Sequence, residues 1–421
     1  MSLSGVLDAA CGYLDLAGDE ADYIVVALAV AVASELVDEE PLWLILTGAS
    51  SSGKTEAIRI LRNVADKQVD ELTRAGLLSW STVGKKARKT GLLTVIPEIA
   101  LVTISDFSTV VTMGDREARA RMFGMLRVIY DGRVYRSIGG QPASEDETNT
   151  PDTLEWEGHL TLLAGATNAI DTHLSFEASL GERWLLYRLP ESTAERARRR
   201  AAFSISREQI GERRAHAQQL AATLVQNARK RIPAHLGDEA KNLILDAAVF
   251  CAHARTGVQF EGTGKQRIPI GYPAREEPNR LAGQLDRLAR CLVALGLTER
   301  QAAAFSVRAA CDSVPLARFK ALRAVADEKA ATVASVHRAI GRGNRWGAIW
   351  ELEALGAISM VEVEGPDRSE DEKATRTYAL NPAYRQVYES VASFFKRKEH
   401  RGEAQADPTD SHTSESELEW R

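Results

Sequence analysis

PLWLILTGASSSGKTEAI, residues 41–58, is the stretch of the sequence that decides the fold. Its first part, Leu42–Leu46, is an uninterrupted apolar run, which is typical of a strand covered on both faces. A loop of small residues follows, and the segment from Glu56 to Val64 predicts a helix. Strand, G-x-x-x-x-G-K-T and helix in this order predict a phosphate-binding loop (P-loop) for a nucleotide.

Each residue type in this loop suits the binding of phosphate. Glycines allow backbone N–H groups to turn toward an anion, and the helix adds the partial positive charge of its first turn. Lys54 is expected on the β- and γ-phosphates, and the Thr55 hydroxyl on Mg²⁺. We therefore expect ATP and Mg²⁺ as cofactors. The expected ATP-binding residues of the loop are Gly48, Ala49, Ser50, Ser51, Ser52, Gly53, Lys54 and Thr55.

The composition limits the class of protein. A chain of 421 residues allows two or three domains, and its net charge of -5 gives no overall basic field, so DNA contact would require local basic patches. No signal peptide and no bilayer-spanning segment is expected, which favours a cytoplasmic protein without a membrane partner. The scattered cysteines are expected to be reduced and buried. They are Cys11, Cys251, Cys291 and Cys311.

A second apolar run, Leu101–Asp106, predicts a buried strand that ends in a carboxylate. Asp106 is expected to lie beside the water shell of Mg²⁺ and to act as a metal-site and catalytic residue. Phe107 stands where a glutamate that activates water usually follows. The general base therefore stays open between Glu98, before the strand, and Glu117, in the next predicted helix.

The segment after the helix predicted at 115–130 suggests a hairpin and a third buried strand. Strands at 133–138 and 153–157 flank an acidic, turn-rich tip, and HLTLLAGA at 159–166 predicts a strand that leads to Asn168. A polar side chain at this strand tip can hold the attacking water. Arg183 precedes another apolar strand and is placed to reach the γ-phosphate of a neighbouring subunit.

Several basic segments are candidates for contacts with nucleic acid or nucleotide. A cluster at 85–89 is predicted to lie in a loop after a helix at 69–79, and a basic run at 196–214 is predicted to be mostly a solvated helical face. Arg280 begins a predicted helix at 280–295, and its guanidinium could point toward the nucleotide. On the hairpin, Arg133 and Arg136 are candidate DNA contacts.

Residues 315–382 predict three helices and two strands, the pattern of a winged-helix module whose third helix would enter a DNA major groove. Its candidate DNA contacts are Arg342 and Arg345, at the start of that third helix. Winged helices also bind proteins, so both functions stay open. The helices are predicted at 316–325, 331–340 and 344–355, and the strands at 357–363 and 376–380.

In this order, the parts resemble an AAA+ ATPase, with the closest likeness to the MCM-like ATPases of phages, plasmids and integrated elements. The likeness covers roughly residues 20–385 and is carried by GASSSGKT (48–55), ISDFSTV (104–110), IYDG (129–132), WEGHLTLLAGATN (156–168), LGERWLLYRL (180–189) and PNRLAGQLDRLAR (278–290). It implies an α/β fold: an AAA+ P-loop NTPase core with a parallel sheet between helices, a helical lid and a C-terminal winged-helix domain. The implied divisions are N-terminal helices (1–38), AAA+ core (39–190), lid (191–312), winged-helix domain (313–395) and a disordered tail (396–421).

The resemblance also implies roles for single residues. Asn168 would be sensor 1, Arg183 the arginine finger and Arg280 the sensor 2 arginine that contacts ATP. With Lys54 and Asp106, the first two complete the implied catalytic set. The hairpin at 133–157 would face a central channel. Implied partners are single-stranded or forked DNA, further copies of the chain in a ring (a hexamer is expected), and a primase or replication initiator as a candidate.

Three functions stay open at this point. The first is a DNA-translocating ATPase, a helicase or replication initiator of a mobile genetic element. The second is an ATP-gated DNA-binding switch or helicase loader with slow hydrolysis, which Phe107 favours. The third is a small-molecule P-loop kinase, which ranks lower because a kinase needs neither an arginine in trans nor a winged helix.

Overall fold

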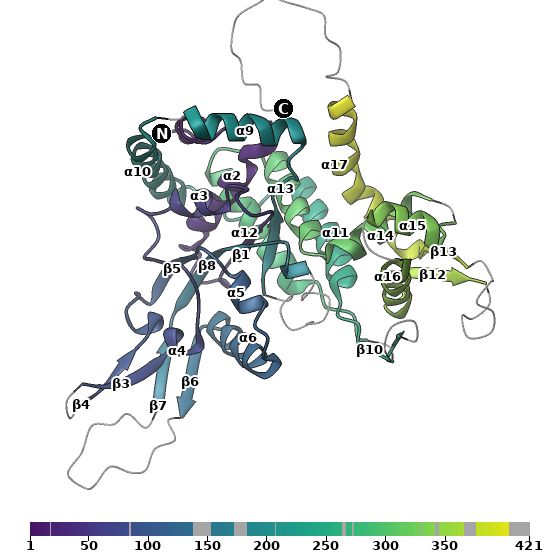
Figure 1. Ribbon diagram of the computed structural model, residues 1–421, viewed down its shortest axis with the longest axis horizontal. Coiled ribbons are helices and arrows are strands. Elements are labelled where there is room, and N and C mark those ends of the chain that lie inside the picture. The colour runs from purple at the N-terminus through teal and green to yellow at the C-terminus, as the bar shows by residue number, and fades with distance from the viewer. Residues whose placement is uncertain are drawn as a thin grey trace, which may run out of the picture.

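Five parallel strands form the centre of the molecule, in the order β2-β5-β8-β1-β9 (Figure 1). This computed structural model describes residues 1–16, 18–83, 86–137, 153–171, 183–206, 208–262, 267–271, 273–328, 330–341, 345–365 and 376–403. The central strands are β1 (Trp43–Thr47), β2 (Lys67–Val69), β5 (Ile99–Ile104), β8 (His159–Ala166) and β9 (Leu185–Arg188). The predicted α/β class, with a parallel sheet between helices, is confirmed.

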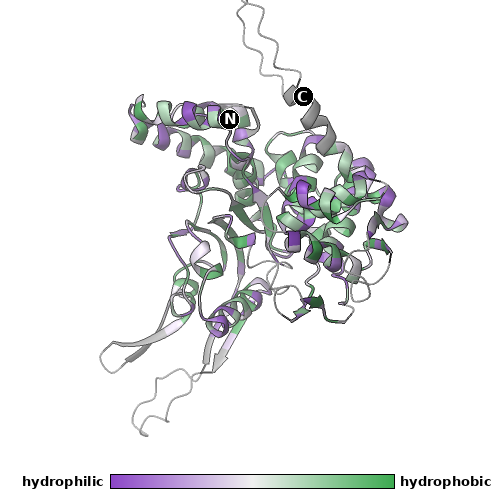
Figure 2. Ribbon diagram, turned by 45° about the vertical axis from the view of Figure 1, so that its right-hand side comes forward, coloured by the Kyte–Doolittle hydropathy of each residue, from purple (hydrophilic) through white to green (hydrophobic). Residues whose placement is uncertain are grey.

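Helices cover both faces of the sheet. Successive side chains of a strand point to opposite sides, and in β1 they are buried on both, so each face needs a layer of helices. In β1, Leu44 and Leu46 belong to one apolar cluster, whereas Trp43 and Ile45 belong to the other. The first side holds α2 (Asp22–Ala33), α3 (Lys54–Arg59), α12 (Asn279–Ala294) and α13 (Glu299–Asp312). The second side holds α5 (Ser108–Val111) and α6 (Arg116–Tyr130). In Figure 2 the apolar residues gather on the sheet and on the helices packed against it.

Two helices lie at the N-terminal end of the described chain. α1 (Leu3–Cys11) and α2 are separated by a short 3-10 turn, Gly18–Ala21, and every residue of α2 is buried. The prediction that all four cysteines are buried is wrong for Cys11, which lies exposed at the end of α1. No helix in the described part of the chain is long and apolar enough to cross a membrane.

Two antiparallel hairpins project together from one end of the sheet (Figures 1 and 2). One is β6 (Arg133–Ser137) with β7 (Thr153–Glu157), as predicted, and the other is β3 (Ser79–Val83) with β4 (Lys86–Thr90). The helix predicted at 69–79 is wrong: β2 ends at Val69, and α4 spans only Arg74–Leu77. The basic cluster predicted in a loop instead reaches into β4. Val69, where the predicted helix would begin, instead pairs with Ile104 of β5.

A helical part and a smaller C-terminal part follow β9. The helices are α9 (Ala194–Ser206), α10 (Ile210–Arg229) and α11 (Asp238–Arg255). Before α12, two antiparallel strands of two residues each, β10 (Phe260–Glu261) and β11 (Ile268–Pro269), pair with one another. The C-terminal part contains α14 (Leu316–Asp327), α15 (Val333–Ile340), α16 (Arg345–Ala357), β12 (Val361–Glu364), β13 (Thr377–Leu380) and α17 (Arg385–Glu403). The first of these strands begins at Val361 rather than at 357, and Ala331 forms a further bridge to β13. The tail predicted from 396 begins within α17, and residues 404–421 lie outside the described ones.

Candidate functional site

The P-loop lies between β1 and α3, as the sequence predicts. Gly53 has a φ of 102°, in the left-handed region that favours glycine, and a Cβ there would lie 2.5 Å from the hydroxyl oxygen of Tyr23. At Gly48, a Cβ would lie 3.1 Å from both the Leu189 side chain and Ser52 Oγ. Glycine is therefore required at one end of the loop by backbone conformation and favoured at the other by space.

The side chain of Lys54 lies inside the curve of this loop. Its ammonium group donates hydrogen bonds to the carbonyl oxygens of Gly48 (2.9 Å) and Ala49 (2.6 Å) and to Ser52 Oγ (3.2 Å). Burial lowers the pKa of Lys54, and the Asp106 carboxylate acts in the opposite direction. The loop therefore holds a buried cation at its centre, which suits a polyanionic ligand.

The carboxyl ends of β1, β5 and β8 bring three predicted site residues to the same edge of the sheet. Asp106 follows β5 and accepts a hydrogen bond from the Ser108 N–H at 2.8 Å. Asn168 follows β8, and its Oδ1 accepts a hydrogen bond from the Thr47 hydroxyl at 3.4 Å. Lys54, Asp106 and Asn168 thus meet at the sheet edge where ligands bind in α/β folds.

A magnesium ion fits the donors at this edge. Mg²⁺ is commonly held by one or two protein oxygens together with substrate phosphates and water, so Thr55 and Asp106 would suffice. Among the described residues no group of three histidine, cysteine or acidic side chains forms a separate metal site. When bound, the ion would supply positive charge next to the phosphates.

The position after Asp106 belongs to the hydrophobic core. Phe107 is fully buried, with ring centroids 4.9 Å from Trp184 and 6.5 Å from Phe123. A glutamate here would bury its charge among aromatic rings, which explains the residue type. Glu98 precedes β5, so it lies at the opposite end of this strand from Asp106. The six residues of β5, at about 3.3 Å each, separate the two by roughly 20 Å.

Carboxylates that the sequence prediction missed follow β2. Asp70 and Glu71 are exposed at the same edge of the sheet, and the Asp70 carbonyl accepts a hydrogen bond from the Asp106 N–H at 2.9 Å. The signal was an acidic pair after a short strand, but the prediction of a helix at 69–79 concealed it. Glu117 lies on α6, where it forms an ion pair with Arg121.

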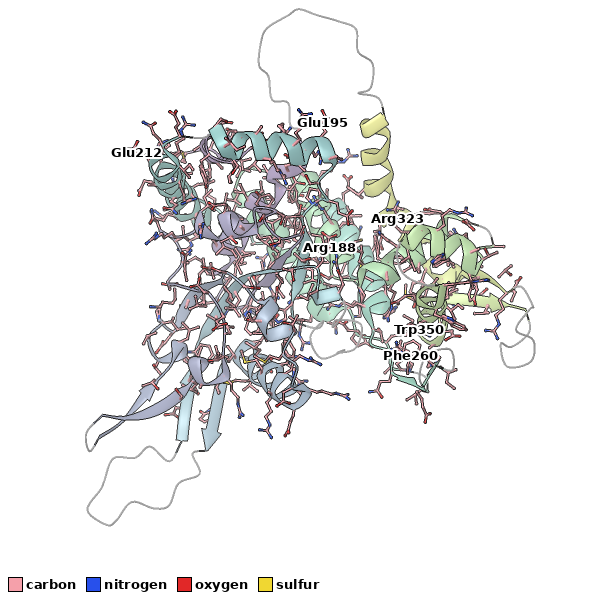
Figure 3. The ribbon with its side chains drawn as sticks, viewed as in Figure 1. Arg188, Glu195, Glu212, Phe260, Arg323 and Trp350 are labelled. Atoms are coloured by element: carbon pink, nitrogen blue, oxygen red, sulfur yellow. The ribbon has the colours of Figure 1, made fainter. Side chains whose placement is uncertain are left out.

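A cavity of about 420 Å³ adjoins the P-loop, which is within the usual range for small-molecule sites. Residues 51–56 form its floor, the chain from Tyr13 to Leu16 and Tyr23 form one wall, and α9 forms another. Figure 3 shows α9 at the top of the molecule, with Glu195 on its outer surface. The sequence prediction did not assign these walls to the site.

The predicted arginine finger lies at the other end of the sheet. Arg183 is mostly buried, and its Nη2 lies 3.2 Å from both carboxylate oxygens of Asp131. Its guanidinium is also 5.7 Å from the centre of the Tyr130 ring. β9 pairs in parallel with β1, and Arg183 precedes β9, so this side chain lies at the amino end.

Arg280 lies in the same neighbourhood as Arg183. Its Nε is 3.9 Å from Glu40, and the Tyr130 hydroxyl donates to that carboxylate at 3.2 Å. Glu40 precedes β1, so the five residues of this strand, at about 3.3 Å each, separate the cluster from the chain's own P-loop by roughly 17 Å. The structure therefore brings Arg183 and Arg280 together, but away from Lys54.

The candidate DNA contacts differ in what surrounds them. Arg133 is exposed on β6, 2.9 Å from Glu157, and lies over the Tyr135 ring. Arg345 is the only exposed residue of α16, because the rest of the helix is at least partly covered. Arg267 covers part of this helix, because its guanidinium lies over the rings of Trp350 and Phe260. Trp350 and Phe260 are labelled next to each other in Figure 3. The remaining candidates, the side chain of Arg136 and all of Arg342, lie outside the described residues.

Comparisons with known proteins give similarity at the level of structure. No family model matches the sequence. No curated protein matches it either. A full-length MCM homolog from Methanopyrus kandleri is 11% identical with a TM-score of 0.41, over 74% of this chain and 59% of that one. The active helicase Cch of SCCmec type IV is 9% identical with a TM-score of 0.33, over 88% and 68%.

A third similar structure is the ORC1 protein of Aeropyrum pernix in complex with DNA, which is 15% identical with a TM-score of 0.25, over 90% of this chain and 94% of that one. The chain thus spans 59% of the length of the MCM homolog. Since every TM-score is below 0.5, the fold assignment rests on the sheet and the P-loop. These define an α/β P-loop NTPase core.

Proposed function

We propose that this protein is an ATP-hydrolysing AAA+ motor or replication initiator that acts on DNA as a ring of identical subunits, in a mobile genetic element. A hexamer is the proposed ring, single-stranded or forked DNA the proposed track, and a primase or initiator a further partner. Lys54, Thr55, Asp106 and Asn168 would bind and activate ATP in one subunit. Arg183 and Arg280 would reach the same ATP from the next subunit.

One observation carries this proposal: the phosphate-binding loop and the two arginines lie at opposite ends of one sheet. Arg183 and Arg280 are roughly 17 Å or more from the chain's own P-loop, counted along β1. A guanidinium cannot bridge that distance, so these side chains can stabilise phosphate only in a second copy. A lone kinase would need its cations at its own nucleotide.

The hairpins support DNA as the track. β6–β7 and β3–β4 project from the same end of the sheet as Arg183, and both carry basic residues. The turn Asp131–Gly132 joins α6 to β6, so the ion pair between Arg183 and Asp131 ties the arginine to the base of a hairpin. Movement of Arg183 at a subunit interface would thereby reach the hairpin. α16, which is largely covered, is the weaker candidate for DNA contact.

Particle mass tests this proposal directly. Mass photometry of the purified chain, with and without a non-hydrolysable ATP analogue and single-stranded DNA, should give a ring when both ligands are present. With ATP in place of the analogue, ATPase activity should rise when single-stranded DNA is added. A monomer throughout, with activity independent of protein concentration, would overturn the ring and favour the kinase.

A switch with slow hydrolysis is the second candidate, and the burial of Phe107 favours it. Because the residue after Asp106 packs in the core, the attacking water would depend on Asn168 or on a carboxylate such as Asp70. Single-turnover and steady-state measurements together separate the two functions. A motor should hydrolyse many ATP molecules per minute on DNA, whereas a switch should bind DNA with ATP and then hydrolyse once, slowly.

A further inference from the structure

Helix α9 is held over the P-loop cavity by charge rather than by apolar packing. None of its residues, Ala194–Ser206, is buried. Glu20, which is 1% exposed, receives Arg199 at 2.7 Å, Arg196 at 3.4 Å and Arg200 at 3.5 Å. Arg199 also pairs with Asp15 at 2.7 Å. Three guanidinium groups therefore face two carboxylates from the N-terminal segment.

This cluster contains one more positive than negative charge, and Arg200 extends it into the cavity. Arg200 lines the cavity beside Gly53, Lys54 and Thr55, whereas Arg196 and Arg199 do not. The loop residues in the cavity belong to the second half of the P-loop and the start of α3. In P-loops, backbone N–H groups of this part hold the α- and β-phosphates. The extra cation therefore lies where those phosphates would bind.

A second observation points to a ligand in the same place. Tyr13 is completely buried and lines the cavity, yet its hydroxyl has no hydrogen-bond partner among the described residues. A buried hydroxyl without a partner is costly unless something else supplies the hydrogen bond. Tyr13 also lies near Arg214, whose guanidinium is 5.7 Å from the ring centre. Tyr13 thus brings to the cavity wall a buried hydroxyl whose hydrogen bond no described residue supplies.

We infer that Arg200 is a nucleotide ligand in cis, which binds the α- and β-phosphates from α9, and that the Tyr13 hydroxyl binds the same nucleotide. This inference rests on the proposed function, because it requires a nucleotide at the P-loop. In this arrangement Glu20 holds Arg200 at the edge of the cavity. When the nucleotide binds, the guanidinium of Arg200 contacts both Glu20 and the phosphates. Nucleotide binding thereby fastens α9 and the N-terminal segment to the P-loop.

Affinities for fluorescent ADP and ATP, measured on the full chain with Mg²⁺, test this inference. Arg200→Gln should weaken both about tenfold, as expected for the loss of a charge-assisted hydrogen bond. Arg200→Lys should recover part of the loss, and Tyr13→Phe should weaken both nucleotides severalfold. Arg196→Gln is the matched control, because Arg196 pairs with the same Glu20 oxygen but does not line the cavity.

The outcomes separate the inference from the proposed function. If the wild type binds nucleotide and Lys54→Ala does not, while Arg200→Gln binds as the wild type does, the inference fails alone. Equal weakening by Arg196→Gln and Arg200→Gln would overturn it, since that result assigns both to holding α9. Weakening for ATP but not ADP would place Arg200 on the γ-phosphate and would also overturn it. A wild type that binds no nucleotide would refute both.

Discussion

The two ends of the central sheet hold opposite halves of a phosphate site. At the carboxyl end, loop carbonyls surround the buried ammonium of Lys54, and Asp106 and Asn168 lie beside it. At the amino end, Arg183 and Arg280 are held by carboxylates and by the Tyr130 ring. The carboxyl end can bind phosphate within one chain, whereas the described residues of the amino end supply cations but no phosphate-binding loop.

This difference explains how one fold can separate binding from hydrolysis. Binding depends on groups that a single chain brings together, so it should survive changes at the amino end. Hydrolysis would depend on both ends, and therefore on contact between copies. Substitutions at the two ends should consequently give different phenotypes.

The largest effect is expected at the carboxyl end. Lys54→Ala should abolish ATP hydrolysis and most nucleotide affinity, because it removes the buried cation that the loop surrounds. Asp106→Asn should retain binding better than turnover, because it mainly weakens the Mg²⁺ site. Equilibrium titration with a fluorescent ATP and a steady-state ATPase assay check both. Turnover like that of the wild type in Lys54→Ala would refute the assignment of this end.

The next effect is expected at the amino end. Arg183→Ala should bind ATP normally but hydrolyse it about 10³–10⁵ times more slowly, the usual contribution of an arginine finger. Mixing it with Lys54→Ala should restore part of the activity, because some interfaces then join an intact P-loop to an intact Arg183. Asp131→Asn is the matched control, since it removes the same ion pair but keeps the guanidinium.

Two results would refute the role of Arg183 in a neighbouring subunit. If the mixed proteins co-assemble but never regain activity, Arg183 does not act across an interface. If Asp131→Asn loses as much turnover as Arg183→Ala, the ion pair itself matters and the arginine holds the base of the hairpin. Arg188 is unsuitable as a control, because Asp171 holds it at 2.6 Å through two hydrogen bonds and Asp312 accepts from its backbone.

The site residues that belong to short, local sequence patterns were predictable. The P-loop, the Asp106 strand and the strand that leads to Asn168 are short apolar runs with polar ends, and parallel strands bring such ends to one edge. The α/β class followed from the same pattern. The hairpin at 133–157 was predictable because its strands flank a turn-rich tip.

What the sequence could not give depends on contacts between distant segments. Val69, the last residue of β2, was mistaken for the start of a helix, because its strand conformation comes from pairing with Ile104 of β5, 35 residues later. The basic run at 196–214 was predicted to be mostly a solvated helical face, and no residue of α9 is buried. Nothing local, however, indicates that three of its arginines pair with the buried Glu20. The separation of Arg280 from Lys54 likewise appears only in three dimensions.

A smaller effect should separate the amino-end hairpin from the C-terminal helices. Arg133→Ala should weaken binding to single-stranded DNA severalfold and reduce the slope of log affinity against log salt by about 0.7, as the loss of one phosphate contact requires. Arg345→Ala should change both less, because α16 is largely covered. Fluorescence anisotropy over a series of salt concentrations measures the slopes. The reverse ranking would assign DNA binding to α16 instead.

The smallest effect concerns a titrating group at the amino end. His159 begins β8, and burial, followed by the nearby Arg287, lowers its pKa from the usual 6.5. Just below pH 6.5, His159 is therefore protonated in the unfolded chain but stays neutral in the folded chain. Stability that is present above pH 6.5 is therefore lost as the pH falls below it.

His159→Gln should remove this contribution. Between pH 7.5 and 5.5, the thermal midpoint of the variant should fall less than that of the wild type, by about 1–3 °C for a single group in a chain of this size. Burial also lowers the pKa of His253, but that contribution is common to both proteins and cancels in the difference. Differential scanning calorimetry at both pH values gives the comparison. An equal fall in both proteins would show that His159 is protonated as readily in the folded chain as in the unfolded one, and that the amino end tolerates a further cation beside Arg287.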